Sequence, residues 1–254
     1  MGFINKKGQV AIFVIIAIVI VAIILAFMFY PKINIGGNSE TGNPKSFIES
    51  CMKEDVNTLL DELSYNGGYE EPEGFIIYQG EKVPYFCYTS DSYETCIVQQ
   101  PNVQGHFENE IERILKPSVE SCVKDFKKEF ESKGYSVSVS KAELNASFVP
   151  GKLKIELMSP MTLSKDTSRT YESFDYEFKS DLYDLMALAT SIIDYESVYG
   201  DSETTLYLRY YPNIKIENVR LDEGSKIYTI SNFVSGERFR FASRSLVWPP
   251  GFEQ

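Results

Sequence analysis

The sequence is poor in the residues on which most active sites depend: among 254 residues it has one histidine, His106, one tryptophan and four cysteines. No GxSxG motif precedes His106, and no single cysteine stands apart as a nucleophile. The cysteines form no CxxC pair and none lies beside the histidine, so a zinc site is not expected. We therefore predict no enzyme, no catalytic residue, no metal and no cofactor, and we expect His106 to be an exposed surface residue.

Loops that bind calcium or phosphate are also missing. The acidic run at 70–73 lacks the alternating Asp and Asn ligands and the fixed glycine of a calcium loop. The glycine-rich stretch GGNSETG contains no Lys-Ser or Lys-Thr, which a phosphate loop requires. The carboxylate pairs Asp61 with Glu62 and Asp181 with Asp184 lie on predicted amphipathic helices, where such pairs ordinarily face water.

Basic residues are outnumbered, with 25 Lys and Arg against 36 Asp and Glu. Two of the basic residues, Lys6 and Lys7, and none of the acidic ones precede a long apolar run, so the remainder carries a net charge of −13. A surface of that sign repels phosphate backbones and anionic lipid headgroups. The composition therefore excludes nucleic acid as a partner.

That apolar run, from Val10 to Tyr30, is 21 residues long and lacks charge, Gly, Pro, Ser and Thr. A helix of this length spans roughly 31 Å, close to the hydrocarbon thickness of a bilayer. The apolar core of a secretory signal is shorter and leads to a small-residue cleavage site, which FMFYP is not. We predict a single transmembrane helix, and the lysine flank places the N-terminus in the cytoplasm and residues 32–254 outside the cell membrane.

The four cysteines are expected to form disulfides, because an even number in an exported domain favours pairing over reduced thiols. Cys87 and Cys96 flank the short, turn-rich segment YTSDSYET and are predicted to pair. Cys51 and Cys122 lie in matching contexts, ESCMKE and ESCVKD, each on a predicted helix, and form the second predicted pair. The alternative is four buried thiols in a reducing compartment.

Periodicity predicts an α+β fold, with amphipathic helices at 46–65, 107–130 and 181–199. Pro117 interrupts the second helix without changing its phase, which predicts a kink or two abutting helices. Pro84 predicts that the second strand of a hairpin around QGEK is an edge strand or irregular. The further predicted strands contain YSVSVS, ELNASFV, KLKIELM, SFDYEF, TTLYLRYY, IKIENVRL, KIYTI and RFRFAS.

The chain is thus divided into a basic cytoplasmic leader at 1–9, the transmembrane helix at 10–30, a Gly- and Asn-rich linker at 31–45 and a disulfide-bonded ectodomain at 46–254. Asn145-Ala146-Ser147 is a predicted N-glycosylation acceptor, which lies within a predicted strand. Tyr69, Tyr85 and Trp248 are candidate exposed contacts for a partner, although packing is the simpler expectation for Trp248.

The stretch KKGQVAIFVIIAIVIV resembles the class III signal peptide of type IV pilins and archaellins, and the start of many small archaeal membrane proteins. The resemblance implies cleavage by a prepilin-type signal peptidase between Gly8 and Gln9, with the apolar helix kept on the mature chain. It also implies that this helix leaves the bilayer and packs against itself or other envelope proteins. The expected function is a structural, pilin-like or pseudopilin-like subunit at the cell surface.

An uncleaved anchor explains the same lysine flank, because Lys-Lys before a membrane span is what topology alone requires. In that alternative the ectodomain is a membrane-tethered binding or adhesion domain for a protein or glycan partner. The residues that distinguish the two hypotheses are Gly8 and Gln9.

Overall fold

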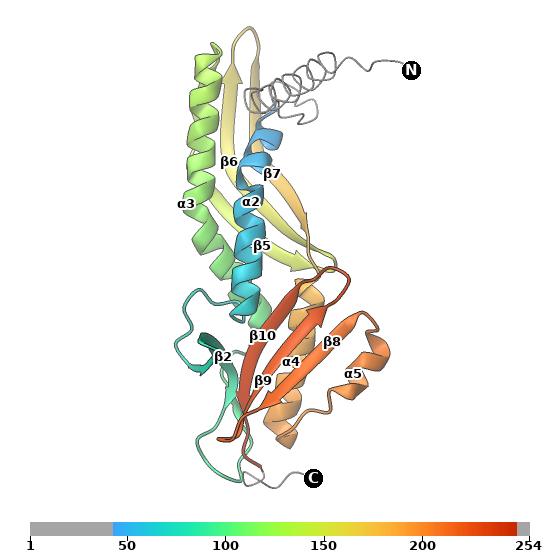
Figure 1. Ribbon diagram of the computed structural model, residues 1–254. Helices are drawn as coiled ribbons and strands as arrows, with labels where there is room; N and C mark the ends of the chain where they lie inside the picture. Colours follow the sequence, from blue (N-terminus) through green and yellow to red (C-terminus); the bar gives the residue numbers. More distant parts are fainter. Residues whose placement is uncertain (1–42, 248–254) are drawn as a thin grey trace, which may run out of the picture. The chain divides into compact units, whose positions relative to one another are not determined.

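The computed structural model describes residues 43–247 (Figure 1). The predicted processing site, the predicted span at 10–30 and Trp248 lie outside the described residues. No helix within residues 43–247 combines the length and the apolar character needed to cross a membrane.

The described part has the predicted α+β composition. Its helices are α2 (Pro44–Tyr65), α3 (Val103–Ser132), α4 (Leu182–Tyr199) and α5 (Thr205–Tyr210). Its strands are β1 (Phe75–Tyr78), β2 (Glu81–Tyr88), β3 (Ile97–Val98), β4 (Ser136–Val139), β5 (Glu143–Val149), β6 (Lys152–Ser164), β7 (Ser168–Lys179), β8 (Ile214–Arg220), β9 (Ser225–Asn232) and β10 (Arg238–Arg244).

The helices α2 and α3 pack along each other and are joined by a disulfide (Figure 1). Cys51 of α2 and Cys122 of α3 have Cα atoms 5.9 Å apart, so the predicted pairing is confirmed. Pro117 lies inside α3, which runs as one helix rather than as two. Because the apolar positions keep their phase through Pro117, one face of α3 stays buried along its whole length.

A four-stranded antiparallel sheet lies against α3. The long strand β6 pairs with β7 along one edge, and with β5 and then β4 along the other. The outer edge of β5 is covered by α3, where Glu108 and Glu112 accept the backbone N–H groups of Phe148 and Ala146 at 2.7 and 2.8 Å. These carboxylates satisfy donors that an open sheet edge would leave unpaired.

A second sheet has the strand order β1-β2-β10-β9-β8, and β3 pairs with β2. Strand β2 lies between β1 and β10, so it is not an edge strand. It is irregular, which is the other alternative predicted from Pro84: its pairing with β10 starts only at Tyr85 and skips Phe86. The N–H of Tyr85 donates to Gly74 on the β1 side, so the nitrogen of Pro84 faces the β10 side, where pairing starts only at Tyr85. The missing donor of Pro84 therefore breaks no sheet hydrogen bond.

Helix α4 covers one face of this second sheet, over β9 and β10 (Figure 1). It ends at Gly200, whose φ of 81° is the left-handed conformation expected for a glycine cap. A single apolar core continues from α2, α3 and the first sheet into the space between α4 and the second sheet. The opposite face of the second sheet carries a smaller cluster built on Val83, Ile227 and Ala242.

The segment TTLYLRYY is a helix rather than the predicted strand. Most of it forms α5, a short helix without a buried residue, and strand β8 begins at Ile214 after a short connection. The apolar and polar residues alternate in the sequence, but the six residues of α5 form a short helix that lies beside β8. A six-residue segment is too short for periodicity to separate helix from strand.

Candidate functional site

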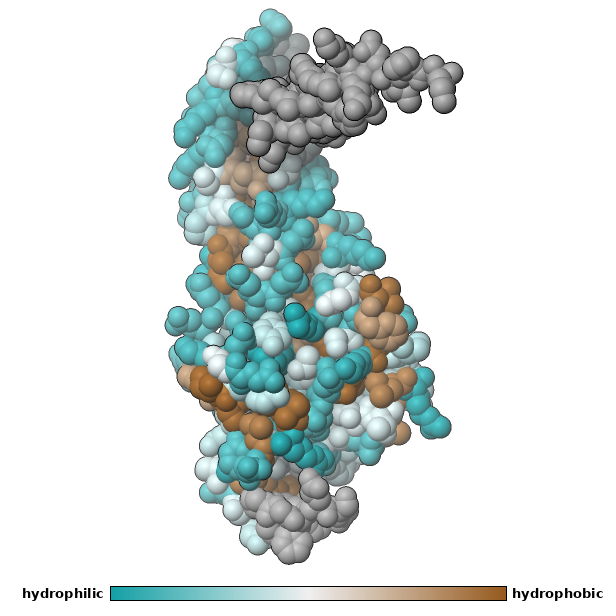
Figure 2. All heavy atoms as spheres, viewed as in Figure 1, coloured by the Kyte–Doolittle hydropathy of each residue, from teal (hydrophilic) through white to brown (hydrophobic). Residues whose placement is uncertain are grey.

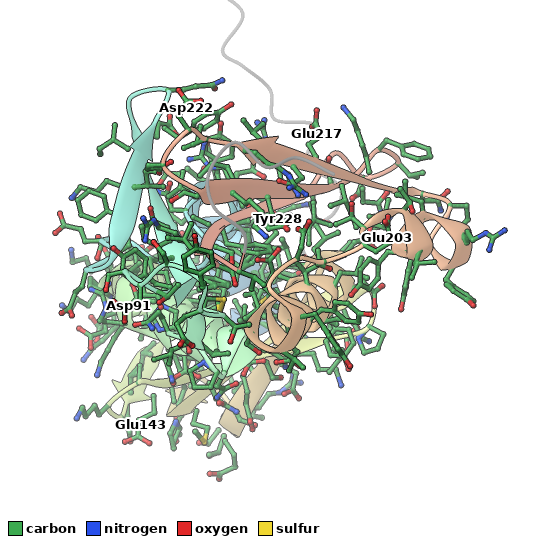
Figure 3. All side chains as sticks on the ribbon, turned by 90° about the horizontal axis from the view of Figure 1, so that it is seen from below. Asp91, Glu143, Glu203, Glu217, Asp222 and Tyr228 are labelled. Carbon is green, nitrogen blue, oxygen red and sulfur yellow. A yellow bond between two sulfur atoms is a disulfide. The ribbon has the colours of Figure 1, made fainter. Side chains whose placement is uncertain are left out.

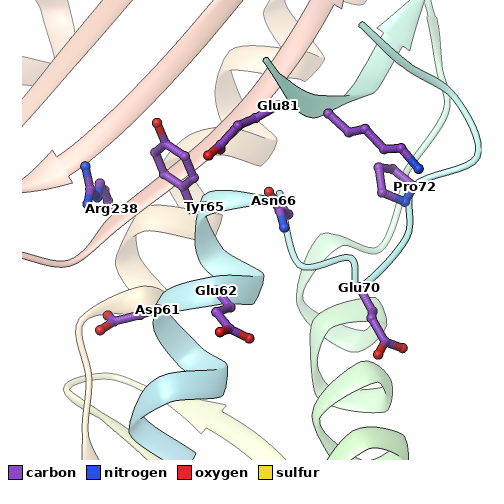
Figure 4. A pocket seen from close by; sticks show the side chains of 9 residues that line it. Asp61, Glu62, Tyr65, Asn66, Glu70, Pro72, Glu81 and Arg238 are labelled. Carbon is purple, nitrogen blue, oxygen red and sulfur yellow. The ribbon is translucent and has the colours of Figure 1, made fainter. Parts of the chain in front are cut away.

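An open cleft of about 530 Å³ lies between the C-terminal end of α2, the loop after it and the β1–β2 hairpin (Figure 4). Its lining residues are Asp61, Glu62, Tyr65, Asn66, Glu70, Pro72, Glu81, Lys82 and Arg238. Helix α2 ends beside the cleft because the N–H of Gly68 bonds the carbonyl of Leu63 at 2.7 Å, with Gly68 in the left-handed conformation.

Tyr65 is held at the cleft by two arginines of β10. The guanidinium of Arg240 lies 3.5 Å from the centre of the Tyr65 ring, and that of Arg238 lies 4.8 Å from it. Arg240 is almost fully buried, donates to the carbonyl of Tyr65 at 3.0 Å and pairs with Glu81 at 2.8 Å. These contacts join α2 to β10, so the cleft has a fixed wall on this side.

The charges around the cleft are only partly paired within the described residues. Glu70 pairs with Arg113 of α3 at 2.6 Å, whereas no ion pair is made by Asp61, Glu62 or Lys82. Figure 4 shows Asp61 and Glu62 on α2 and Glu70 across the opening on the loop. The cleft therefore presents mainly hydrogen-bonding and charged groups to solvent, which suits a polar, hydroxyl-bearing ligand more than an apolar one.

A second cluster is fully buried and was not predicted from the sequence. Glu196 of α4 has no exposed surface and pairs with Lys226 of β9 at 2.5 Å. The same carboxylate accepts hydrogen bonds from the Tyr228 hydroxyl at 2.5 Å, the Ser243 hydroxyl at 3.0 Å and the N–H of Ser202 at 3.3 Å. Figure 3 shows Tyr228 inside the fold, with Asp222, Glu217 and Glu203 at the periphery.

The buried lysine of this cluster has a partner for each of its three protons. Besides Glu196, the Lys226 ammonium donates to the carbonyl of Gly200 at 2.9 Å and to Asp201 at 3.0 Å. Asp201 also pairs with Arg220 at 2.6 Å, and although burial raises its pKa, these two cations lower it below the usual value overall. These contacts fasten α4 and the segment after it to β9 and β10.

One signal could have revealed this cluster. Glu196 follows Ala189, Ile192 and Ile193 on the inward face of α4, and Lys226 shares the inward face of β9 with Tyr228. A carboxylate and an amine at core positions of neighbouring elements are rarely buried unless they pair.

The single histidine is not the exposed residue that was expected. The His106 ring packs on Tyr69 with 3.9 Å between ring centres, and its Nε2 atom is buried without a hydrogen-bond partner among residues 43–247. Burial lowers the pKa of His106, and the nearby Glu110 opposes this shift. His106 is thus half-buried by its contact with Tyr69.

The predicted aromatic contacts are also held within the fold. The Tyr69 hydroxyl accepts a hydrogen bond from the side-chain amide of Gln100 at 2.7 Å, and the hydroxyls of Tyr85 and Ser225 are hydrogen-bonded at 2.7 Å. Neither tyrosine is therefore a free exposed contact. Asn145 is exposed on β5 and remains a predicted glycosylation site. Cys87 and Cys96 pair as predicted, with Cα atoms 5.3 Å apart.

The other acidic candidates stay separate. Asp181 accepts from the side chain of Asn232 at 2.9 Å, and Asp184 is exposed, with its pKa raised by partial burial and by the charge of Asp181. In residues 43–247 no group of three or more His, Cys, Asp or Glu side chains is arranged to hold a metal ion. Comparison with known protein families, curated proteins and solved structures finds no match to this chain.

Proposed function

We propose that the chain is a type IV pilin-like or pseudopilin-like structural subunit of an archaeal cell envelope, with its α+β domain outside the cell membrane. The observation that carries this proposal is Lys6-Lys7-Gly8-Gln9 placed directly before 21 uncharged apolar residues. The two disulfides of the folded part are consistent with an oxidising, extracytoplasmic compartment.

The physical basis of assembly lies in the apolar helix. A basic leader keeps the N-terminus in the cytoplasm, where a prepilin-type signal peptidase cuts after Gly8. The helix that starts at Gln9 keeps its apolar surface, which is buried in lipid before assembly and against neighbouring helices afterwards. Ala22 and Ala26 are four residues apart and so allow close approach of a second helix.

We expect the protein recovered from its native membranes to begin at Gln9. Intact mass and N-terminal sequencing would measure this, and a Gly8→Asp variant would serve as the control, because a glycine before the cut is part of the resemblance. A mature chain that retains Lys6-Lys7-Gly8 would contradict the proposal and leave a plain membrane anchor.

The second candidate function is a membrane-tethered binding domain, and the cleft beside Tyr65 is the observation that favours it. Asp61, Glu62 and Lys82 face solvent there without ion pairs among the described residues. Carboxylates, an amide and cations around an open cleft match the donors and acceptors of a glycan.

This second function predicts that neutral oligosaccharides bind saturably to the full chain in detergent. The binding would be measured from changes in the NMR signals of the sugar. Replacing Asp61 and Glu62 together by alanine should abolish the binding, because it removes two acceptors from one side of the cleft. The matched control is Asp125→Ala on the exposed surface of α3. Equal binding by both variants would exclude the cleft as the site.

A further inference from the structure

Exposed aromatic and aliphatic side chains lie on the last turns of α4, on α5 after it, and on the β9–β10 turn, which meets the start of α4 through a hydrogen bond from Asn232 to Asp181. We call this surface the tyrosine face. It consists of Tyr195, Val198 and Tyr199 of α4, Leu206, Leu208 and Tyr210 of α5, Tyr211, and the β9–β10 turn residues Phe233 and Val234. The exposed fractions are large, with 63% for Tyr199, 52% for Leu206 and 81% for Tyr210.

The parts of the tyrosine face are fastened to one another. Helix α5 lies back against α4, where the hydroxyls of Ser191 and Tyr207 are 2.9 Å apart. The β9–β10 turn joins the segment after α5 through a hydrogen bond from the N–H of Phe233 to the carbonyl of Asn213 at 3.1 Å. Figure 2 shows hydrophobic surface both beside α5 and at the tip of the neighbouring hairpin.

The tyrosine face is large enough for a stable contact between proteins. Aromatic side chains offer about 150–250 Å² each, so the exposed fractions of the five aromatic residues amount to about 450–740 Å², to which the four aliphatic residues add. A standard interface buries about 800 Å² on each partner, whereas a monomer ordinarily exposes apolar patches of only a few hundred Å². Tyrosine is also among the residues that contribute most to interfaces.

The charges on this surface are self-complementary. Arg209 of α5 and Glu203 just before it are both exposed, and neither makes an ion pair within the described residues. Leu206 lies midway between them, three residues from each. An antiparallel, two-fold pairing of α5 centred on Leu206 therefore sets Glu203 of one copy opposite Arg209 of the other, twice in the same contact.

We propose that a second copy of this chain docks on the tyrosine face, with α5 against α5 in this antiparallel arrangement. The contact involves only the folded part, so it does not depend on how the N-terminal segment is processed. A two-fold contact needs one surface that fits itself, which an apolar centre with one cation and one carboxylate at equal distances provides. Two copies anchored in one membrane would also meet at a high effective concentration.

The test is the oligomeric state of the full chain in a nonionic detergent, measured by sedimentation across a concentration series. Wild-type protein should form a concentration-dependent dimer. Leu206→Glu should weaken the dimer at least tenfold, because it sets two carboxylates against each other at the two-fold axis. Ile77→Glu, at another exposed apolar residue on β1, should leave the dimer unchanged. A wild-type monomer throughout the series, or equal effects of both variants, would overturn the proposal.

Charge exchange tests the arrangement itself. Arg209→Glu alone and Glu203→Arg alone should each weaken the dimer, because each sets like charges together. The double variant should restore it, because the attraction is re-formed with its signs exchanged. A lipid or a basic protein as the true occupant would give no restoration, and that result would overturn the two-fold contact. Circular dichroism would verify that every variant is folded.

Discussion

Replacing Glu196 by alanine is expected to lower the free energy of unfolding by about 3–5 kcal/mol, the usual cost of removing one partner from a buried ion pair. The substitution leaves the ammonium of Lys226 buried with only Asp201 as an anionic partner. It also deprives the hydroxyls of Tyr228 and Ser243 of their acceptor. Burial and the charge of Glu196 together raise the pKa of Tyr228, so this hydroxyl stays protonated and needs an acceptor.

Urea unfolding followed by circular dichroism would measure this loss. Asp194→Ala is the matched control, since Asp194 lies two residues away on the exposed side of the same helix. We expect the control to change stability by no more than about 0.5 kcal/mol. A loss below about 1 kcal/mol for Glu196→Ala would show that the cluster is not what fastens α4 to the second sheet.

Removing the disulfide between α2 and α3 should have a comparable effect. Cys51 and Cys122 are 71 residues apart, and a closed loop of that length stabilises the folded chain by about 4 kcal/mol in the chain-entropy model. The bond between Cys87 and Cys96 closes only nine residues and should contribute about 2.5–3 kcal/mol. Double serine variants of each pair, unfolded in urea without reductant, would measure the two contributions.

Exposure predicts the order in which the two bonds are reduced. Cys51 is exposed on α2, whereas Cys87 of β2 and Cys96, just before β3, are both buried. Mild reductant should therefore open the bond between Cys51 and Cys122 first, which alkylation and peptide mass mapping would detect. Preferential opening of Cys87–Cys96, or a smaller loss for the longer loop, would contradict this account.

Long elements with a buried face were predictable from the sequence. Helices α2, α3 and α4 repeat apolar residues every three or four positions, and β5, β6 and β7 alternate them, so pattern and structure agree. The cysteine pairs were predictable because matching helix contexts and a short turn leave few other pairings. In each case the pattern that predicts the structure is formed by residues close to one another in the sequence.

What could not be predicted depends on contacts between distant segments. The centre position of β2 follows from its parallel pairing with β10, for which Pro84 gives no indication. The cleft beside Tyr65 needs Arg238 and Arg240 from the end of the chain to lie against α2. Likewise, Glu196 looks like an interruption of an apolar face until Lys226 is known to lie opposite.

The position of β10 determines when the second sheet can be completed. Strand β10 lies between β2 and β9, and Tyr85 of β2 pairs with Ala242 of β10. The side of β2 that faces β10 therefore stays unpaired until Ala242 has been synthesised. The first sheet has no such delay, since β4 to β7 follow one another in sequence. During synthesis, the half of the domain built on α3 can fold while its C-terminal strands are still emerging. Until β10 has been synthesised, this side of β2 can pair with strands of other chains. Truncations shortly before Arg238 should therefore aggregate rather than fold.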